Sequence, residues 1–101
     1  MKKTAYLINT ARGQVVEEKA VLQALAKKWI AGAALDVFEC EPAIDCDLKD
    51  HLELRKMENV IMTPHMASAT IATRSAMAEV AAKNIIAALK GQTPPNALKL
   101  V

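Results

Sequence analysis

Polar residues that can do chemistry follow each of three short apolar runs in the chain. Arg12 comes after the first run, and His65 comes after the third, in the stretch NVIMTPHMASAT (59–70). Two carboxylates, Asp36 and Glu41, come at or just after the end of the second run. An imidazole beside a carboxylate forms an acid–base pair, and a guanidinium can hold a carboxylate-bearing substrate with two hydrogen bonds. Together these residue types suit proton transfer on a small organic acid.

Each of these residues also has an ordinary structural explanation when it is taken alone. An arginine after a strand is usually a solvated loop residue, and an aspartate at a strand end often caps a turn. A single histidine is more often a surface or core residue than a catalyst. The residues therefore form a candidate site only if the fold brings them together.

The apolar runs predict the strands that would position these residues. We expect strands at 5–9, 30–38 and 60–62. The second run is apolar at nearly every position, which is typical of a strand buried on both faces in a parallel sheet. Between 39 and 58 the chain is polar and irregular, with a short helix expected at 47–56.

Two longer helices are expected from apolar residues that recur at spacings of three and four. The first has acidic residues at its start and lysines at its end, which suits the helix macrodipole, and its apolar face holds Ala20, Val21, Ala24 and Leu25. The second runs from Ser68 or Thr70 to Lys90 and is expected to bury one stripe. Gly91 should end it.

The order strand, helix, strand, link, strand, helix predicts an α/β fold with parallel strands and right-handed crossovers. Ligands of open parallel sheets bind beyond the carboxyl ends of the strands, so the polar residues above should lie along one rim. A sheet of about three strands has an unpaired edge and poorly covered faces. We therefore also expect a homo-oligomer, a dimer.

Composition limits the possible classes of protein. The 101 residues suffice for one domain, and the net charge of +2 comes from scattered basic residues, which argues against a nucleic-acid partner. No apolar stretch approaches the length needed to span a membrane, and the amino terminus has no signal-peptide pattern. Cys40 and Cys46 predict neither a disulfide framework nor a zinc site, so no metal is expected and a reducing cytoplasm is the expected location.

Three blocks of the sequence resemble the D-isomer-specific 2-hydroxyacid dehydrogenases. These blocks are LINTARGQVVEE (7–18), IAGAALDVFECEP (30–42) and NVIMTPHMASAT (59–70), and the tail GQTPPNAL (91–98) resembles the usual family ending. The resemblance implies the carboxyl-terminal portion of a Rossmann-like, doubly wound parallel sheet. It also implies an oxidoreductase that transfers hydride between NAD or NADP and a small D-2-hydroxy acid or 2-oxo acid. Within the family, the chain is most similar to the glyoxylate/hydroxypyruvate reductase branch.

The resemblance implies a role for each matching position. Arg12 would bind the substrate, His65 would be the general acid/base, and Glu41 would orient and charge its imidazole. Asp36 would lie near the nicotinamide amide. The positions implied to line the cofactor are Thr10, Ala11, Arg12, Asp36, His65, Met66, Ala67 and Ser68.

The chain departs from the family pattern in three ways. Glu17 replaces the usual capping aspartate, and Lys28 replaces the glycine that usually closes the helix, at a cost of about 1 kcal/mol if its backbone is left-handed. The resemblance also covers only a late part of the family's chain. With three glycines in all, the sequence contains no Gly-x-Gly-x-x-Gly loop.

We therefore expect residues 1–101 to be the carboxyl-terminal segment of a dinucleotide-binding domain, with 91–101 as its tail. The amino-terminal half of that domain and the substrate domain would be absent, and the isolated chain would be inactive. One alternative is a non-catalytic fragment or interaction module that self-associates through an exposed sheet edge. Another is a complementing fragment that is active only with an amino-terminal chain.

Overall fold

The computed structural model describes residues 1–41 and 49–98, which fall into two compact units. The first unit, Met1–Ala67, contains the strands and nearly all of the candidate site residues. The second unit, Ser68–Val101, contains one long helix and the tail that follows it. Each unit has its own pattern of packing.

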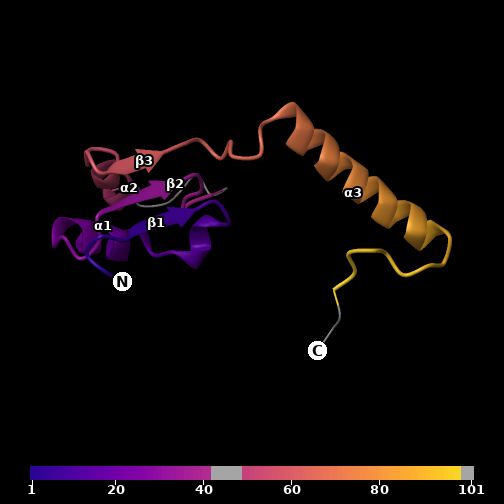
Figure 1. Cartoon of the computed structure of the whole chain (residues 1–101), viewed down its shortest axis with the longest axis horizontal. Coiled ribbons are helices and arrows are strands. Elements are labelled where there is room, and N and C mark those ends of the chain that lie inside the picture. The colour runs from indigo at the N-terminus through magenta and orange to yellow at the C-terminus, as the bar shows by residue number, and fades with distance from the viewer. Residues whose placement is uncertain (42–48, 99–101) are drawn as a thin grey trace. The chain divides into compact units, whose positions relative to one another are not determined.

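The first unit is built on a three-stranded parallel sheet of order β1-β2-β3 (Figure 1). The strands are β1 (Tyr6–Asn9), β2 (Gly32–Leu35) and β3 (Val60–Met62). In the register, Ile8 pairs with Ala34, and Ala34 pairs with Ile61. The predicted α/β class and parallel pairing are confirmed. The predicted second strand was too long, because only four of its residues have partners in the ladder.

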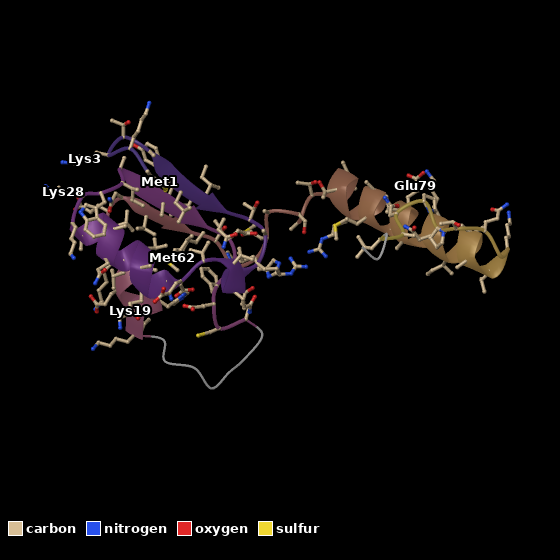
Figure 2. The ribbon with its side chains drawn as sticks, turned by 90° about the horizontal axis from the view of Figure 1, so that it is seen from below. Met1, Lys3, Lys19, Lys28, Met62 and Glu79 are labelled. Carbon is tan, nitrogen blue, oxygen red and sulfur yellow. The ribbon has the colours of Figure 1, made fainter. Side chains whose placement is uncertain are left out.

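One face of the sheet is covered by α1 (Glu18–Ala26) and α2 (Lys49–Leu54). Met62, labelled in Figure 2, packs against the core cluster to which α1 contributes Val21 and Leu25. Leu54 is completely buried in this layer. The described part of this core contains Val21, Leu25, Ile30, Ala33, Leu35 and Leu54. Burial of this apolar layer is the main stabilising contribution to the unit.

The other face of the sheet is open. Tyr6 and Ile8 are each 69% exposed, and Ile61 is 67% exposed. Together with half-buried Ala34 they line an apolar hollow of about 440 Å³. Burial of the second strand on both faces was expected, and this is wrong at Ala34, because the described residues of this unit place no helix over that side. The expected poor cover of the strand faces is confirmed.

Glu17 and Lys28, the two residues that depart from the family pattern, lie at the two ends of α1. Glu17 occupies the position before the helix, and its side chain makes no capping hydrogen bond. Lys28 has a left-handed backbone, with φ of 55°. Trp29 N–H donates to the Ala24 carbonyl, and Lys28 N–H donates to the Leu25 carbonyl. These two hydrogen bonds are the pair that defines a Schellman motif. Lysine therefore occupies a position that favours glycine.

The second unit is dominated by α3 (Ile71–Leu89). Thr70 caps its first turn by accepting a hydrogen bond from Thr73 N–H, and Gly91, with φ of 68°, ends it. Asn84 exchanges two hydrogen bonds of 3.0 Å with Asn96, which ties the tail to the helix. The expectation that this helix buries one apolar stripe is wrong, because no residue of α3 is buried.

The structure bears on the expectations for the cysteines and for membrane crossing. Cys40 is disulfide-bonded, so the expectation of no disulfide is wrong at that residue, whereas Cys46 lies outside the described residues. Among residues 1–41 and 49–98, no helix is both long and apolar enough to cross a lipid bilayer.

Candidate active site

The turn that carries Arg12 is organised by Asn9, the last residue of β1. Asn9 is 5% exposed, and its side-chain oxygen accepts from Ala11 N–H while its amide donates to the Arg12 carbonyl at 3.0 Å. A short polar side chain at a strand end commonly forms such turns. Within the described part of the chain, the Arg12 guanidinium donates only to the Ala11 carbonyl, at 2.7 Å, and the residue is exposed. Its backbone is thus fixed and its charge remains accessible.

Gly13 lets this turn pack directly against the loop that follows β2. A Cβ atom at Gly13 would lie only 1.7 Å from the Phe38 carbonyl oxygen, so no other residue fits without moving that loop. Gly13 begins η1 (Gly13–Val15), a single 3-10 turn, and the loop continues to Glu41. The two segments that carry the guanidinium and one carboxylate are therefore neighbours in space.

His65 and Glu41 form a close side-chain pair. The Nδ1 atom of His65 lies 2.7 Å from Oε2 of Glu41, and the two side chains are 52% and 32% exposed. His65 has φ of 53°, a left-handed conformation that is uncommon for residues with a side chain. Such backbone conformations persist only where the surrounding structure enforces them, and they occur often at functional sites.

Asp36 holds the backbone around His65 in this conformation by hydrogen bonds to residues on either side of it in sequence. Its Oδ1 accepts from the Thr63 hydroxyl at 2.5 Å and from Met66 N–H at 2.8 Å, and its Oδ2 accepts from Ala67 N–H at 2.8 Å. The carboxylate therefore anchors the chain on both sides of His65. Charge-assisted bonds of this kind are stronger than neutral ones.

These contacts lower the pKa of the Asp36 carboxyl below its ordinary value of 3.8. The Thr63 hydroxyl has the largest effect and the Ala67 N–H the next, because both stabilise the charged form. Burial acts in the opposite direction but is outweighed, and Met66 N–H and the charge of His65 lower the pKa further. Asp36 is therefore ionised at neutral pH.

An open cavity of about 360 Å³ brings the candidate side chains together. It is lined by Arg12, Gly13, Gln14, Glu41 and His65. It lies at the carboxyl ends of the parallel strands, where the sequence placed the rim. A guanidinium, a carboxylate and an imidazole therefore face one space.

The other predicted positions are not among the residues that line this cavity. Thr10 and Ala11 are exposed on the Arg12 turn, and Met66 and Ala67 are held by Asp36. Ser68 begins the second unit and is not placed relative to the rim. In the part of the chain that the structure describes, no three His, Cys, Asp or Glu side chains are grouped so as to hold a metal ion.

Three residues of this arrangement were not singled out from the sequence. Asn9 had a detectable signal, since an asparagine at the end of a strand before a small residue predicts an Asx turn. Thr63 and Gln14 had none, because their partners lie 25 to 27 residues away along the chain.

The open parallel sheet with a polar rim at its carboxyl ends defines a Rossmann-like nucleotide-binding fold. Residues 1–67 match the model of the D-isomer specific 2-hydroxyacid dehydrogenase family, NAD binding domain. The chain therefore belongs to this oxidoreductase family, through its NAD-binding domain.

Similar proteins of known name agree with this assignment. The chain is 60% identical over 95 residues to a glyoxylate reductase of Thermofilum pendens, which covers 94% of this chain and 26% of that relative. It is 53% identical over 95 residues to a glyoxylate reductase of Pyrococcus horikoshii, covering 94% and 27%. The chain thus spans about a quarter of the length of these relatives.

Solved structures with the same fold carry either nicotinamide cofactor. An NAD-complexed D-isomer specific 2-hydroxyacid dehydrogenase from Lactobacillus delbrueckii ssp. bulgaricus superposes with a TM-score of 0.76 at 34% identity, covering 98% of this chain and 32% of that one. An NADPH-dependent glyoxylate/hydroxypyruvate reductase from Sinorhizobium meliloti, in complex with NADP and malonate, gives 0.66 at 41% identity, covering 85% and 25%.

The glycines indicate which end of a dinucleotide these residues can hold. A Cβ at Gly13 would meet the Phe38 carbonyl and one at Gly32 the Asn59 carbonyl, while Gly91 ends α3. None of the three therefore forms a cradle in which a backbone can approach a pyrophosphate. These glycines therefore do not fit the pyrophosphate of a dinucleotide.

Proposed function

We propose that this chain supplies the catalytic rim of an NAD- or NADP-dependent enzyme that interconverts a small 2-oxo acid, of the glyoxylate or hydroxypyruvate type, and its D-2-hydroxy acid. The observation that carries the proposal is the 2.7 Å contact of His65 with Glu41 beside a cavity that Arg12 also lines. The names of the relatives, glyoxylate reductases, support the substrate class.

Arg12 is proposed to bind the substrate carboxylate. Its guanidinium is always charged, and its planar fork matches two carboxylate oxygens. The bonds of Asn9 to Ala11 and Arg12 hold the backbone of this turn. Binding the carboxylate at a fixed point orients the adjacent carbonyl group for reaction.

His65 is proposed to move the proton. At 2.7 Å the Glu41 carboxylate can only accept, so Nδ1 of His65 carries a hydrogen and Nε2 is the nitrogen that exchanges a proton with substrate. In reduction, the carbonyl carbon gains hydride, with both bonding electrons, and the carbonyl oxygen takes the proton from the imidazolium. The product is the hydroxyl group, and the neutral imidazole is charged again from solvent.

A bound reduced nicotinamide supplies the hydride of this reaction. Within this chain, Thr10, Ala11 and the backbone beside His65 are proposed to line the nicotinamide, and Asp36 is proposed to lie near its amide. The pyrophosphate requires a helix amino terminus with a glycine-rich loop, which these residues do not provide. We therefore propose that the 101-residue chain alone is inactive.

A chimaera tests the proposed function. The chain replaces the matching quarter of the Thermofilum pendens glyoxylate reductase, with which it is 60% identical. The chimaera should reduce glyoxylate with NADH or NADPH. Since general acid–base catalysis contributes about 100- to 10,000-fold, His65→Asn should lower kcat by a factor in that range. His51→Asn, which changes the chain's other histidine, is the matched control.

Two results would contradict the proposal. A His65→Asn chimaera with a rate near that of the parent would remove the acid–base assignment. Turnover of glyoxylate by the pure 101-residue chain would show that the residues supplied by the relative are not needed.

A second candidate function is an interaction module that self-associates, and a separate observation favours it. The open face of the sheet exposes Tyr6, Ile8 and Ile61, and both outer strands, β1 and β3, are edges of the described sheet. Exposed apolar patches and unpaired edges favour association. The homo-oligomer, expected to be a dimer, would form on this surface.

Sedimentation velocity of the 101-residue chain tests this second function. A dimer that dissociates in Ile8→Lys and Ile61→Lys, and persists in Val15→Lys, would support it. Val15 is equally exposed, at 68%, but lies in η1 and not on the sheet. A parent chain that stays monomeric at high concentration would exclude it.

A further inference from the structure

Gln14 connects the two segments that carry the candidate catalytic groups. Its side-chain amide donates to the carbonyl oxygen of Glu39 at 3.3 Å and also to the carbonyl oxygen of Glu41. A carboxamide has two N–H donors on one nitrogen, so the two carbonyls use both of them. Gln14 is exposed and has no part in the hydrophobic core. Its bonds therefore act on the path of the loop and not on packing.

The loop that Gln14 holds is fastened at its other points as well. Glu39 N–H donates to the Glu18 carboxylate at 2.9 Å, and Glu18 N–H donates to the Glu39 carboxylate at 3.2 Å. The Glu41 N–H closes a turn onto the Phe38 carbonyl at 3.1 Å. Of these bonds, the one from Gln14 to the Glu41 carbonyl and the one from Glu41 N–H to the Phe38 carbonyl act on Glu41 itself, whose carboxylate faces His65.

We infer that Gln14 is a positioning residue that holds Glu41 against His65 and thereby selects the Nδ1–H tautomer of the imidazole. Gln14 lines the same cavity as those two residues and approaches the loop from the Arg12 side. Asp36 fixes the backbone that follows His65, through Met66 N–H and Ala67 N–H. Gln14 acts on the other partner of the pair, Glu41. This inference rests on the proposed function, in which the nitrogen left unprotonated by Glu41 exchanges the substrate proton.

The ratio of the two neutral tautomers of His65 distinguishes a positioning role of Gln14 from a merely structural one. A histidine tautomer is set by the hydrogen bond that one ring nitrogen makes. A loosened Glu41 loop weakens the Nδ1–H bond without opening the core, so the ratio of the two neutral tautomers changes while the fold is retained. Nitrogen-15 NMR of the full 101-residue chain at alkaline pH measures this ratio and needs no enzymatic activity.

Gln14→Met keeps the length of the side chain and removes both donors. We expect it to raise the ratio of Nε2–H to Nδ1–H at His65 by about threefold or more, since a hydrogen bond of this kind has a modest net free energy. Glu41→Met sets the full effect, and Gln23→Met, at an exposed glutamine of α1, is the matched control. Gln14→Lys restores donors at this position and should recover most of the parent ratio.

The outcomes separate this inference from the proposed function. If Gln14→Met matches Gln23→Met while Glu41→Met changes the ratio, Gln14 does not position Glu41 and the inference is wrong, but the His65–Glu41 pair remains. If Glu41→Met also leaves the ratio unchanged, the pair itself is absent in solution, and both fail. The His51 signals report whether each variant is folded.

Discussion

The Thr63 hydroxyl donates a hydrogen bond of 2.5 Å to the Asp36 carboxylate, although 27 residues separate them in sequence. Together with Met66 N–H and Ala67 N–H, this bond ties the end of β3 to the end of β2. His65 lies between the anchored residues with its left-handed backbone. The position of the imidazole thus depends on a carboxylate that has no direct hydrogen bond to it.

Replacing Asp36 with asparagine should destabilise the unit in a pH-dependent way. The contacts lower the pKa of the folded Asp36 carboxyl below 3.8, so their contribution to the free energy of unfolding is fully present above that pH. It is lost as the pH falls through the lower, folded value. Urea denaturation should therefore show the parent more stable than Asp36→Asn at pH 7 and pH 5, with the difference shrinking as the pH falls below 3.8.

Thr63→Val should shift stability in the same direction by a smaller amount, because one of the three donors is lost. Thr4→Val, at an exposed threonine outside the network, is its control. A difference between parent and Asp36→Asn that grows as the pH falls would contradict the assignment of these contacts.

Replacing Arg12 with lysine should weaken substrate turnover in the chimaera with the Thermofilum pendens enzyme. Lysine keeps the charge but not the planar fork, so one of two charge-assisted hydrogen bonds is lost. We expect kcat/KM for glyoxylate to fall by about 10- to 100-fold, in line with the free energy of a hydrogen bond to a charged group. Steady-state kinetics measure the change, and an unchanged kcat/KM would exclude Arg12 from substrate binding.

Replacing Lys28 with glycine should stabilise the first unit. The backbone at Lys28 has φ of 55°, which glycine adopts without the steric cost that a side chain imposes. The free energy of unfolding should rise by about 1 kcal/mol. Lys27→Gly is the control, because Lys27 has φ of −86° and gains nothing from glycine. Equal effects of the two substitutions on the urea midpoint would show that the left-handed backbone is not the cause.

Replacing Leu54 with alanine should destabilise the first unit strongly. Leu54 is 0% exposed and packs in the layer between α1, α2 and the sheet. A leucine-to-alanine change at a buried site costs about 2 to 5 kcal/mol. Leu52→Ala, on the same helix at 48% exposure, should change stability by less than about 1 kcal/mol. Thermal denaturation of both variants tests the contrast, which would be absent if α2 did not pack on the core.

Much of the fold was predictable because local patterns encode it. The strand at 60–62 was predicted with its observed bounds, and the long helix was predicted from Ser68 or Thr70 to Lys90 and is observed at Ile71–Leu89. Capping and stop residues act on their own neighbours, so they leave a signal in a few consecutive positions. The resemblance marked Lys28 as the position where a glycine usually closes the helix, and the structure shows that its backbone is left-handed.

The sequence by itself determined the order of strands and helices, and with it the common rim on which Arg12, Asp36, Glu41 and His65 were expected. Only the tertiary structure decided that Gln14 bonds to the Glu41 loop, that Asp36 anchors both sides of His65, and that the open face of the sheet is the one with Tyr6, Ile8 and Ile61. The physical reason is range. Periodicity and capping are set within one or two turns of chain, whereas a hydrogen bond between residues 24 to 31 apart depends on strand register and loop path, which no short stretch of sequence specifies.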